Sequence, residues 1–338
     1  MNAIRVGMIG YGYWGPNLAR NIHEMPSSKL VAIADQKEKQ LDRARAKYPE
    51  VALVNDYKDL FNMGLDAVVV ATPPHTHYSI AKDCLDHGLH VLVEKPLTDQ
   101  SSHAQNLIDI ACKKDLTLMV GHTFQYNSAV LALKKLILQQ ELGNIYYLDA
   151  ARLNLGLYQN NSNVLWDLAV HDISILLFLL DQLPISVSAQ GVPCVTKGVY
   201  DVAYLNLIFP NNVTAYVHVS WLDPCKVRRV TVVGSKKMAV YNDMETEGKI
   251  KVYDKGIDAP PYTEGFGEFH YNYRTGDITI PNIRFVEPLQ EECSHFVDSV
   301  INHTPPRTSG QNGLQVIKVL EAAMRSIENS ATQEVIQW

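Results

Sequence analysis

Residues Gly10 to Gly15 read GYGYWG, directly after the apolar run Ile4 to Ile9 and before a helix-like segment, Asn17 to Met25. In a GxGxxG sequence at a strand-to-helix turn, the first glycine permits the turn and the second lets the backbone approach a pyrophosphate. The third lets the helix and the strand pack closely, and the start of the helix binds the anion. The stretch therefore predicts a dinucleotide site. The alternative is a tight turn in an α/β domain that binds no ligand.

An acidic residue at the end of the next strand bears on the choice of cofactor. The apolar run Leu30 to Ala34 ends in Asp35, at the distance from Gly15 that the motif requires. A carboxylate here accepts hydrogen bonds from the adenosine ribose, whereas it would repel the 2′-phosphate of NADP. Asp35 therefore favours NAD over NADP. Lys37 and Lys39 lie close in the sequence, and their positive charges make this preference weaker.

The composition is that of a globular protein with more than one domain. The 338 residues exceed what a single hydrophobic core usually fills, and 46% of them are hydrophobic and 20% charged. A net charge of −6 without a long basic run argues against nucleic-acid binding. The apolar run Ile173 to Leu180, which is interrupted only by Ser174, is far too short to span a membrane.

The cysteines and the first residues indicate a cytoplasmic protein. A strand that starts at Ile4 leaves no room for a signal peptide. The five cysteines are scattered and form no CxxC pair, so we expect reduced thiols and no zinc site. His75 and His77 have no acid or cysteine at ligand spacing, and we therefore expect no metal.

The pattern of apolar runs changes between residues 121 and 125. Before this point, short apolar runs alternate with amphipathic stretches, as in βα units around a parallel sheet. Beyond it, alternating segments such as Val202 to Phe209 and Val213 to Trp221 indicate an antiparallel sheet. We therefore expect an α/β chain with a dinucleotide-binding domain over residues 1–123 and a substrate domain over residues 124–338, with the substrate in the crevice between them.

A lysine follows one of the buried strands. Val91 to Pro96 read VLVEKP, which places Lys95 at the carboxyl edge of the sheet, where open α/β folds bind ligands. Pro96 restricts the backbone of Lys95. A partly desolvated lysine near an oxidised nicotinamide loses proton affinity and can take part in acid–base chemistry. The alternative is a surface lysine in a loop.

An acid and a histidine share one face of the apolar helix that begins near Trp166. Asp167 and His171 are four residues apart, and Asp167 lies in the first turn, where a negative charge is favoured. A histidine oriented by a carboxylate can take the proton of an alcohol as hydride leaves the same carbon. The alternative is a capping acid and a core histidine, while Asp172 points elsewhere and is expected to be structural.

Other polar residues are candidates for substrate contact. Tyr126 lies at the predicted crossing between the domains, where it could face the crevice or pack in the hinge. Arg152 and Asn154 share a strand face, as do Lys226 and Arg228, and such donors suit hydroxyl groups or a diphosphate. Solvated strand faces are the alternative explanation.

The chain resembles the glucose-fructose oxidoreductase/inositol dehydrogenase/MocA family in four motifs. They are the GxGxxG followed by Asp35, the run VATPPHTH at Val70 to His77, the EKP at Glu94 to Pro96 and the DxxxH at Asp167 to His171. The resemblance covers essentially the whole chain. It implies an N-terminal Rossmann domain and a C-terminal α+β domain with a large, open-faced, mostly antiparallel sheet. It also implies homodimers or homotetramers built through that sheet.

The resemblance also implies roles for particular residues. Lys95, Asp167 and His171 would be catalytic, and Lys95 and His171 would also touch the substrate. The residues that would line the NAD site are Gly10, Tyr11, Gly12, Tyr13, Trp14, Gly15, Asp35, Ala71, Thr72, Pro73, Pro74, His77, Glu94 and Lys95.

The expected reaction is oxidation of a secondary hydroxyl group of a sugar by NAD. His171 would remove the hydroxyl proton, Lys95 would polarise the same oxygen and Asp167 would fix the imidazole, although the roles of Lys95 and His171 could be exchanged. The GYGYWGPN run and Arg152 to Asn154 are similar to family members that oxidise the 3-hydroxyl of UDP-N-acetylglucosamine or its uronate in polysaccharide assembly. Free sugar or inositol oxidation, and a non-catalytic regulator that binds NAD(H) and sugar, are the alternatives.

Overall fold

The computed structural model describes residues 3–156, 158–159, 162–258 and 272–338, and the chain divides into two compact units. Unit 1 runs to Asn127 and also contains Val286–Glu321 and Trp338. Unit 2 contains Ser128–Phe285 and Ala322–Gln337. The domain boundary expected after residue 123 thus differs from the observed division, chiefly because residues 286–321 return to unit 1. Their helix buries apolar side chains in the core of unit 1, a long-range contact that no local pattern reveals.

Unit 1 is built on a six-stranded parallel sheet with the strand order β3-β2-β1-β4-β5-β6. The order reverses between β1 and β4, and open α/β sheets bind dinucleotides at such a reversal, beyond the carboxyl ends of the strands. β4 is buried along its whole length, as expected for a strand covered on both faces. The strands are β1 Ile4–Ile9, β2 Ser28–Ala34, β3 Ala52–Val54, β4 Ala67–Val70, β5 His90–Glu94 and β6 Leu118–Gly121.

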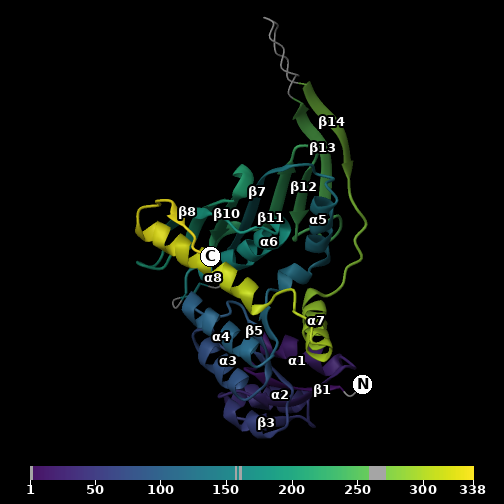
Figure 1. Ribbon diagram of the computed structural model, residues 1–338, viewed down its shortest axis with the longest axis vertical. Coiled ribbons are helices and arrows are strands. Elements are labelled where there is room, and N and C mark those ends of the chain that lie inside the picture. The colour runs from purple at the N-terminus through teal and green to yellow at the C-terminus, as the bar shows by residue number, and fades with distance from the viewer. Residues whose placement is uncertain (1–2, 157, 160–161, 259–271) are drawn as a thin grey trace, which may run out of the picture. The chain divides into compact units, whose positions relative to one another are not determined.

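Helices connect and cover these strands (Figure 1). α7, from the returning segment, packs against α1 and against the short helix η3 that follows β6. Its residues Leu289 and Phe296 join the same buried cluster as Leu92 and Met119 of the sheet. The helices of unit 1 are α1 Gly15–Glu24, α2 Glu38–Lys47, η1 Tyr57–Asn62, η2 Pro74–Thr76, α3 His77–Asp86, α4 Ser101–Lys113, η3 Thr123–Tyr126 and α7 Pro288–Asn302.

Unit 2 is built on a nine-stranded sheet with the order β14-β13-β12-β11-β7-β10-β9-β8-β15. Adjacent strands of this sheet run antiparallel, except for β7 and β10, which run parallel to each other. β13 and β14 form a ribbon that projects beyond the other strands of the sheet (Figure 1). The strands are β7 Ile145–Leu155, β8 Ser186–Val192, β9 Val202–Ile208, β10 Thr214–Ser220, β11 Leu222–Gly234, β12 Met238–Asn242, β13 Ile250–Asp258, β14 Asn272–Thr279 and β15 Glu334–Val335.

Helices of unit 2 lie against this sheet: α5 contacts β12, and α6 contacts β7 and β10. A π-helical turn, η4, precedes α6, and the short η5 joins β9 to β10. The two sheets confirm the predicted α/β class, with a parallel N-terminal sheet and a mostly antiparallel C-terminal one. The helices are α5 Ser128–Leu138, η4 Leu165–Ala169, α6 Val170–Leu180, η5 Pro210–Asn212 and α8 Gly310–Glu328, which begins in unit 1 and ends in unit 2.

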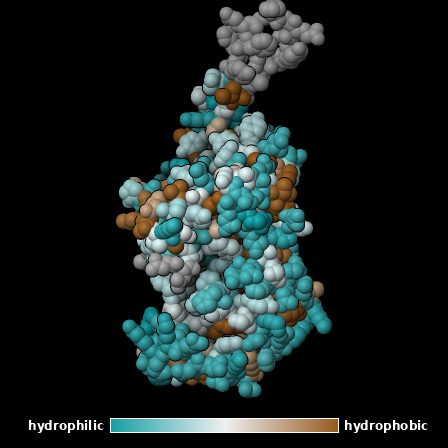
Figure 2. Space-filling model, turned by 90° about the vertical axis from the view of Figure 1, so that its left-hand side faces the viewer, coloured by the Kyte–Doolittle hydropathy of each residue, from teal (hydrophilic) through white to brown (hydrophobic). Residues whose placement is uncertain are grey.

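Large apolar side chains are exposed mainly on unit 2. Tyr204 and Tyr216 of the neighbouring strands β9 and β10 are 52% and 45% exposed, whereas in unit 1 the main examples are Tyr13 and Trp14. On the face shown in Figure 2, the surface of unit 1 is mostly hydrophilic and unit 2 carries scattered apolar groups. Among the described residues, none of the helices combines the length and the hydropathy needed to cross a membrane.

Candidate functional site

The glycine-rich loop follows β1 directly and leads into α1. Gly10 has a φ of +92°, and a Cβ there would meet the carbonyl oxygen of Ala71 at 2.5 Å. A Cβ on Gly15 would collide with the carbonyl oxygen of Gly10, whereas a Cβ on Gly12 would find no atom within 4 Å. The first and third glycines thus allow close backbone packing, and the second faces open space. This is the arrangement that a pyrophosphate requires at the start of a helix.

Asp35 lies beside this loop at the end of β2. Its Oδ2 accepts a hydrogen bond of 2.7 Å from the Tyr11 N–H, and its Oδ1 accepts one of 2.8 Å from the Lys37 N–H. The carboxylate is therefore held in place by the backbone. A groove of about 640 Å³ opens next to it in unit 1. The residues predicted to bind the cofactor that line this groove are Gly10, Gly12, Asp35, Ala71, Thr72 and Pro73.

The other residues predicted for the cofactor surround the loop in different environments. Tyr11 is buried, while Tyr13 and Trp14 are exposed and meet edge to face with ring centroids 5.8 Å apart. His77 is fully buried between two loops, with Nδ1 2.8 Å from the Pro96 carbonyl oxygen and Nε2 2.9 Å from that of Thr72. Burial lowers the pKa of His77. The ring therefore joins the loop after β4, which includes the exposed Pro74, to the loop after β5.

Glu94 and Lys95 end β5 at the carboxyl edge of the sheet. Glu94 Oε2 accepts a hydrogen bond of 3.2 Å from the Lys95 N–H and would lie 3.3 Å from a Cβ on Gly121, its partner in β6. Burial raises the pKa of Glu94 to about 7, although the Lys95 charge and N–H partly oppose this effect. The peptide bond between Lys95 and Pro96 is cis.

Two further buried side chains lie beside this edge, and neither was assigned a catalytic or cofactor-binding role from the sequence. His122 follows β6, and burial together with the positive charge of Lys95 lowers its pKa to about 3. Glu292 of α7 is fully buried, and burial together with the negative charge of Glu94 raises its pKa well above the usual range. Tyr126, expected near the substrate, is also buried, with its hydroxyl 3.1 Å from that of Thr308.

In unit 2, Asp167 lies in the π-helical turn η4 and His171 in the first turn of α6. π-Helical turns inside α-helices are frequent at functional sites. Asp167 Oδ2 accepts a hydrogen bond of 3.0 Å from the indole Nε1–H of the buried Trp221. This bond fixes the carboxylate at the start of the helix that carries His171.

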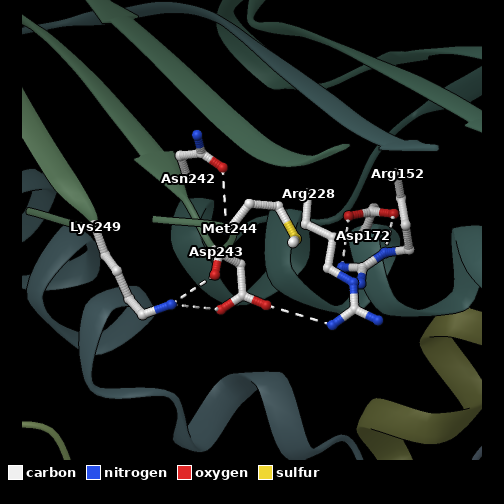
Figure 3. A network of polar contacts seen from close by, with 7 residues as sticks. All are labelled: Arg152, Asp172, Arg228, Asn242, Asp243, Met244 and Lys249. Carbon is white, nitrogen blue, oxygen red and sulfur yellow. Dashed lines mark hydrogen bonds and ion pairs between the residues drawn. The ribbon is translucent and has the colours of Figure 1, made fainter. Parts of the chain in front are cut away.

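Arg152 of β7 makes a buried pair with Asp172 of α6. Its Nε and one terminal nitrogen donate to the two carboxylate oxygens over 2.8 and 2.9 Å, and Figure 3 shows the two groups facing each other. Only 6% of the Arg152 side chain and 2% of that of Asp172 are exposed. The pair therefore ties α6 to the sheet, and Asp172 is structural, as expected.

Arg228 belongs to a neighbouring network that is more open to solvent. Asp243 lies between Arg228 and Lys249, at 3.4 Å and 3.3 Å from their nitrogens (Figure 3). Burial would raise the pKa of Asp243, but these cations and Tyr241 outweigh it and lower the pKa. Lys226 is exposed on the same strand as Arg228, and Asn154 is partly exposed on β7.

Sequence patterns gave no signal for Glu292, Asp243 or the π-helical turn. Glu292 is one of two adjacent glutamates on a helix distant in sequence from the parallel sheet, and only the packing of α7 brings it to β5. Asp243 follows β12 in a turn that carries no motif. Among the described residues, no group of three or more His, Cys, Asp or Glu side chains forms a metal site.

Comparisons with known proteins agree with this geometry. Residues 4–122 match a family model described as oxidoreductase family, NAD-binding Rossmann fold, and residues 130–240 match the GFO/IDH/MocA C-terminal domain. The chain is 26% identical over 322 residues to a UDP-N-acetylglucosamine 3-dehydrogenase of Acidithiobacillus ferrooxidans, covering 93% of this chain and 94% of the relative. It is 24% identical over 351 residues to a myo-inositol 2-dehydrogenase of Thermotoga maritima, covering 98% and 100%.

Solved structures show the same fold. The Acidithiobacillus ferrooxidans enzyme superposes with a TM-score of 0.79 at 24% identity, over 98% of this chain and 100% of that one. GenD2 from gentamicin A biosynthesis, in complex with NAD, superposes with a TM-score of 0.83 at 21% identity, over 100% and 97%.

Proposed function

The chain belongs to the GFO/IDH/MocA family of NAD(P)-dependent dehydrogenases, and on this premise we propose that it oxidises a secondary hydroxyl group of a sugar with NAD. Three side chains carry the proposal: Lys95 at the end of β5, and Asp167 and His171 at the start of α6. A family member that only bound its ligands would not need all three.

NAD is favoured over NADP by the setting of Asp35. Its carboxylate is held by two backbone N–H groups at the edge of the groove, where it can accept hydrogen bonds from ribose hydroxyls. A 2′-phosphate at this place would meet a fixed negative charge. The glycine cradle at Gly10, Gly12 and Gly15 fits the pyrophosphate.

In the proposed reaction, His171 accepts the hydroxyl proton of the substrate, and Lys95 donates a hydrogen bond to the same oxygen as a carbonyl forms. Asp167, held by the indole of Trp221, keeps the imidazole oriented. The roles of Lys95 and His171 can be exchanged in this scheme. Bound NAD supplies the hydride acceptor.

For the substrate we propose the 3-hydroxyl of a nucleotide sugar of the UDP-N-acetylglucosamine type. The similarity to a UDP-N-acetylglucosamine 3-dehydrogenase over 93% of the chain supports it. Lys226 and Arg228 are the cations we propose for the diphosphate, with Asn154 near the sugar. Tyr126 is buried in the core of unit 1, so we no longer assign it to the substrate. Arg152 already donates to Asp172, so its contribution would be to hold β7 in place. The similarity to a myo-inositol 2-dehydrogenase supports a free sugar or inositol as the second candidate.

A substrate screen tests the proposal through the absorbance of reduced nicotinamide. Purified protein is mixed with NAD or NADP and with UDP-sugars, free sugars or inositols. We expect turnover with a UDP-sugar and NAD, and weaker turnover with NADP. Turnover confined to free sugars or inositols would favour the second candidate. Binding of NADH and sugars without any turnover would favour the regulator.

Variants connect turnover with the proposed residues. Lys95→Ala and His171→Ala should each lower kcat by about 10²- to 10⁴-fold, the usual contribution of acid–base catalysis, and leave NADH affinity nearly unchanged. Lys113→Ala, at an exposed lysine in the last turn of α4, is the matched control and should behave as the wild type. Unchanged turnover in either catalytic variant would refute the assignment.

We also propose that the protein is a homodimer or homotetramer that associates through the open face of the nine-stranded sheet. Tyr204 and His218 stack on this face with ring centroids 4.1 Å apart, and Tyr216 is exposed beside them. Exposed apolar patches of this kind often mark protein interfaces. Sedimentation of the wild type should give a dimer or tetramer, and Tyr204→Lys with Tyr216→Lys should shift it toward monomer. A monomeric wild type would contradict the proposal.

A further inference from the structure

Two carboxyl groups lie next to the lysine at the end of β5: Glu94, which is partly buried, and Glu292, which is fully buried. Glu292 is 0% exposed, and neither of its oxygens makes a hydrogen bond of ordinary geometry. The same holds for both ring nitrogens of the neighbouring buried residue His122. Buried polar groups are nearly always hydrogen-bonded, so such groups call for an explanation.

Packing brings this carboxyl to the sheet edge. The buried side chains that flank Glu292 on α7, Leu289 and Cys293, share a cluster with Leu92 of β5 and Met119 of β6. Glu94 ends β5, and its carboxyl lies over Gly121, where no side chain separates it from the next strand. The negative charge of Glu94 acts on Glu292, and both groups favour the protonated form relative to an exposed glutamate.

The surroundings limit how many negative charges the pair can hold. Two carboxylates close together in a desolvated site cannot both ionise at little cost, and such a pair commonly shares one proton. Lys95 supplies one positive charge, and His122 is held neutral. The titratable, charged and hydroxyl groups around the pair are Lys95 beyond β5, His122, Thr123 and Tyr126 beyond β6, Arg20 of α1, Arg307 before α8, and Glu287 and Cys293 at α7.

The pair also lies at the edge of the sheet where the nicotinamide half of a bound dinucleotide would be expected. With the adenosine half beside Asp35 and β2, the nicotinamide half extends across the strand-order reversal toward β4, β5 and β6. An oxidised nicotinamide ring is a cation, and a reduced one is neutral. The charge of the nicotinamide ring therefore changes at the edge of the sheet where Glu94 ends β5. This part of the inference rests on the proposed function, because it requires that the protein binds NAD.

We propose that Glu94 and Glu292 share one proton that is coupled to the redox state of the cofactor. The pair releases this proton to solvent when the cationic NAD⁺ binds, because the second negative charge then has a partner. When the alcohol carbon gives hydride to NAD⁺, the ring loses its charge. The pair then takes up one proton, equal in number to the proton that the hydroxyl group lost, so charge and atoms balance. Glu292 is a positioning residue in this scheme, because it acts through Glu94.

The experiment measures the affinities for NADH and NAD⁺ across a range of pH. NADH binding is followed by its fluorescence and NAD⁺ binding by competition, on both sides of the Glu94 pKa of about 7. In the wild type, the ratio of the NADH Kd to the NAD⁺ Kd should rise with pH, by up to about tenfold per pH unit for one linked proton. A ratio that is independent of pH would overturn the proposal.

Variants assign the linkage to the pair. Glu292→Gln removes the second carboxyl group of the pair, so the two residues can no longer share a proton and the pH dependence of the ratio should be much weaker than in the wild type. Glu291→Gln changes the exposed neighbour on the same helix and should keep the wild-type slope. A slope in Glu292→Gln equal to that of the wild type would overturn the proposal, because another group would then carry the proton.

A calorimetric measurement needs no variant. The enthalpy of NAD⁺ binding, compared in buffers of different ionisation enthalpy, gives the number of protons released, and we expect a value approaching one near neutral pH. No proton release would overturn the inference. If the linkage is present but no sugar is oxidised, the proposed substrate fails and the pair stands. If neither form of the cofactor binds, both fail.

Discussion

Asp172 and Glu292 are both fully buried carboxyl groups, but their neighbours have opposite charge. Asp172 receives two hydrogen bonds from Arg152, so its charge is compensated. The negative charge of Glu94 acts on Glu292, and neither oxygen of Glu292 makes a hydrogen bond of ordinary geometry. The first arrangement contributes to holding a helix on a sheet. The second raises the pKa of both carboxyl groups and favours their protonated forms.

The difference separates structural from chemical uses of a buried acid. A buried ion pair costs several kcal/mol only when one partner is removed, because the remaining charge is then uncompensated. A buried like-charge pair already bears such a cost, which it relieves by binding a proton. Strongly perturbed carboxyl groups of the second kind are typical of functional sites.

The largest effect should come from breaking the compensated pair. Arg152→Met leaves Asp172 buried without a cation and should lower the free energy of unfolding by about 3–5 kcal/mol. Denaturant unfolding of the purified protein measures the loss. The double variant Arg152→Met with Asp172→Leu is the control and should recover most of it, because no buried charge remains. A loss below about 1 kcal/mol in the single variant would remove the contrast between the two acids.

A smaller, pH-dependent effect should come from the uncompensated pair. The folded pKa of Glu94 is raised from 4.5 to about 7, and that of Glu292 is raised as well, so the folded state binds more protons than the unfolded state in this range. The free energy of unfolding should therefore fall as pH rises from about 5 to 7, by up to about 1.4 kcal/mol per pH unit for each proton.

Glu292→Gln tests this dependence. At about pH 5 a neutral amide replaces a neutral acid, and the stability should change by no more than about 1 kcal/mol. Toward higher pH the variant should lose less stability than the wild type, while Glu291→Gln should follow the wild type. Unfolding curves in denaturant at several pH values provide the measurement, and parallel curves for all three proteins would contradict the expected sign.

Local patterns predicted the parts of the molecule that are built from neighbouring residues. The glycine-rich loop, Asp35 and the strands on either side of the loop, β1 and β2, were expected, because the loop geometry and the apolar runs are encoded within short segments.

Long-range partners could not be predicted in the same way. Arg152 was expected to contact the substrate, but its guanidinium donates to Asp172, which lies on a different element. The π-helical turn around Asp167 has no residue signature, because its extra residue per turn is set by packing. Glu292 acquires its neighbour Glu94 only when α7 folds onto unit 1.

The return of residues 286–321 to unit 1 constrains how the protein can be made. During synthesis, the parallel sheet leaves the ribosome long before α7 exists, and Leu289, Cys293 and Phe296 are then missing from its core. The core of unit 1 therefore stays incompletely covered while residues 128–285, the larger part of unit 2, are translated. Because α7 is translated only after residues 128–285, the core of unit 1 cannot be completed before most of unit 2 has been made, and the folding of the two units is linked in time.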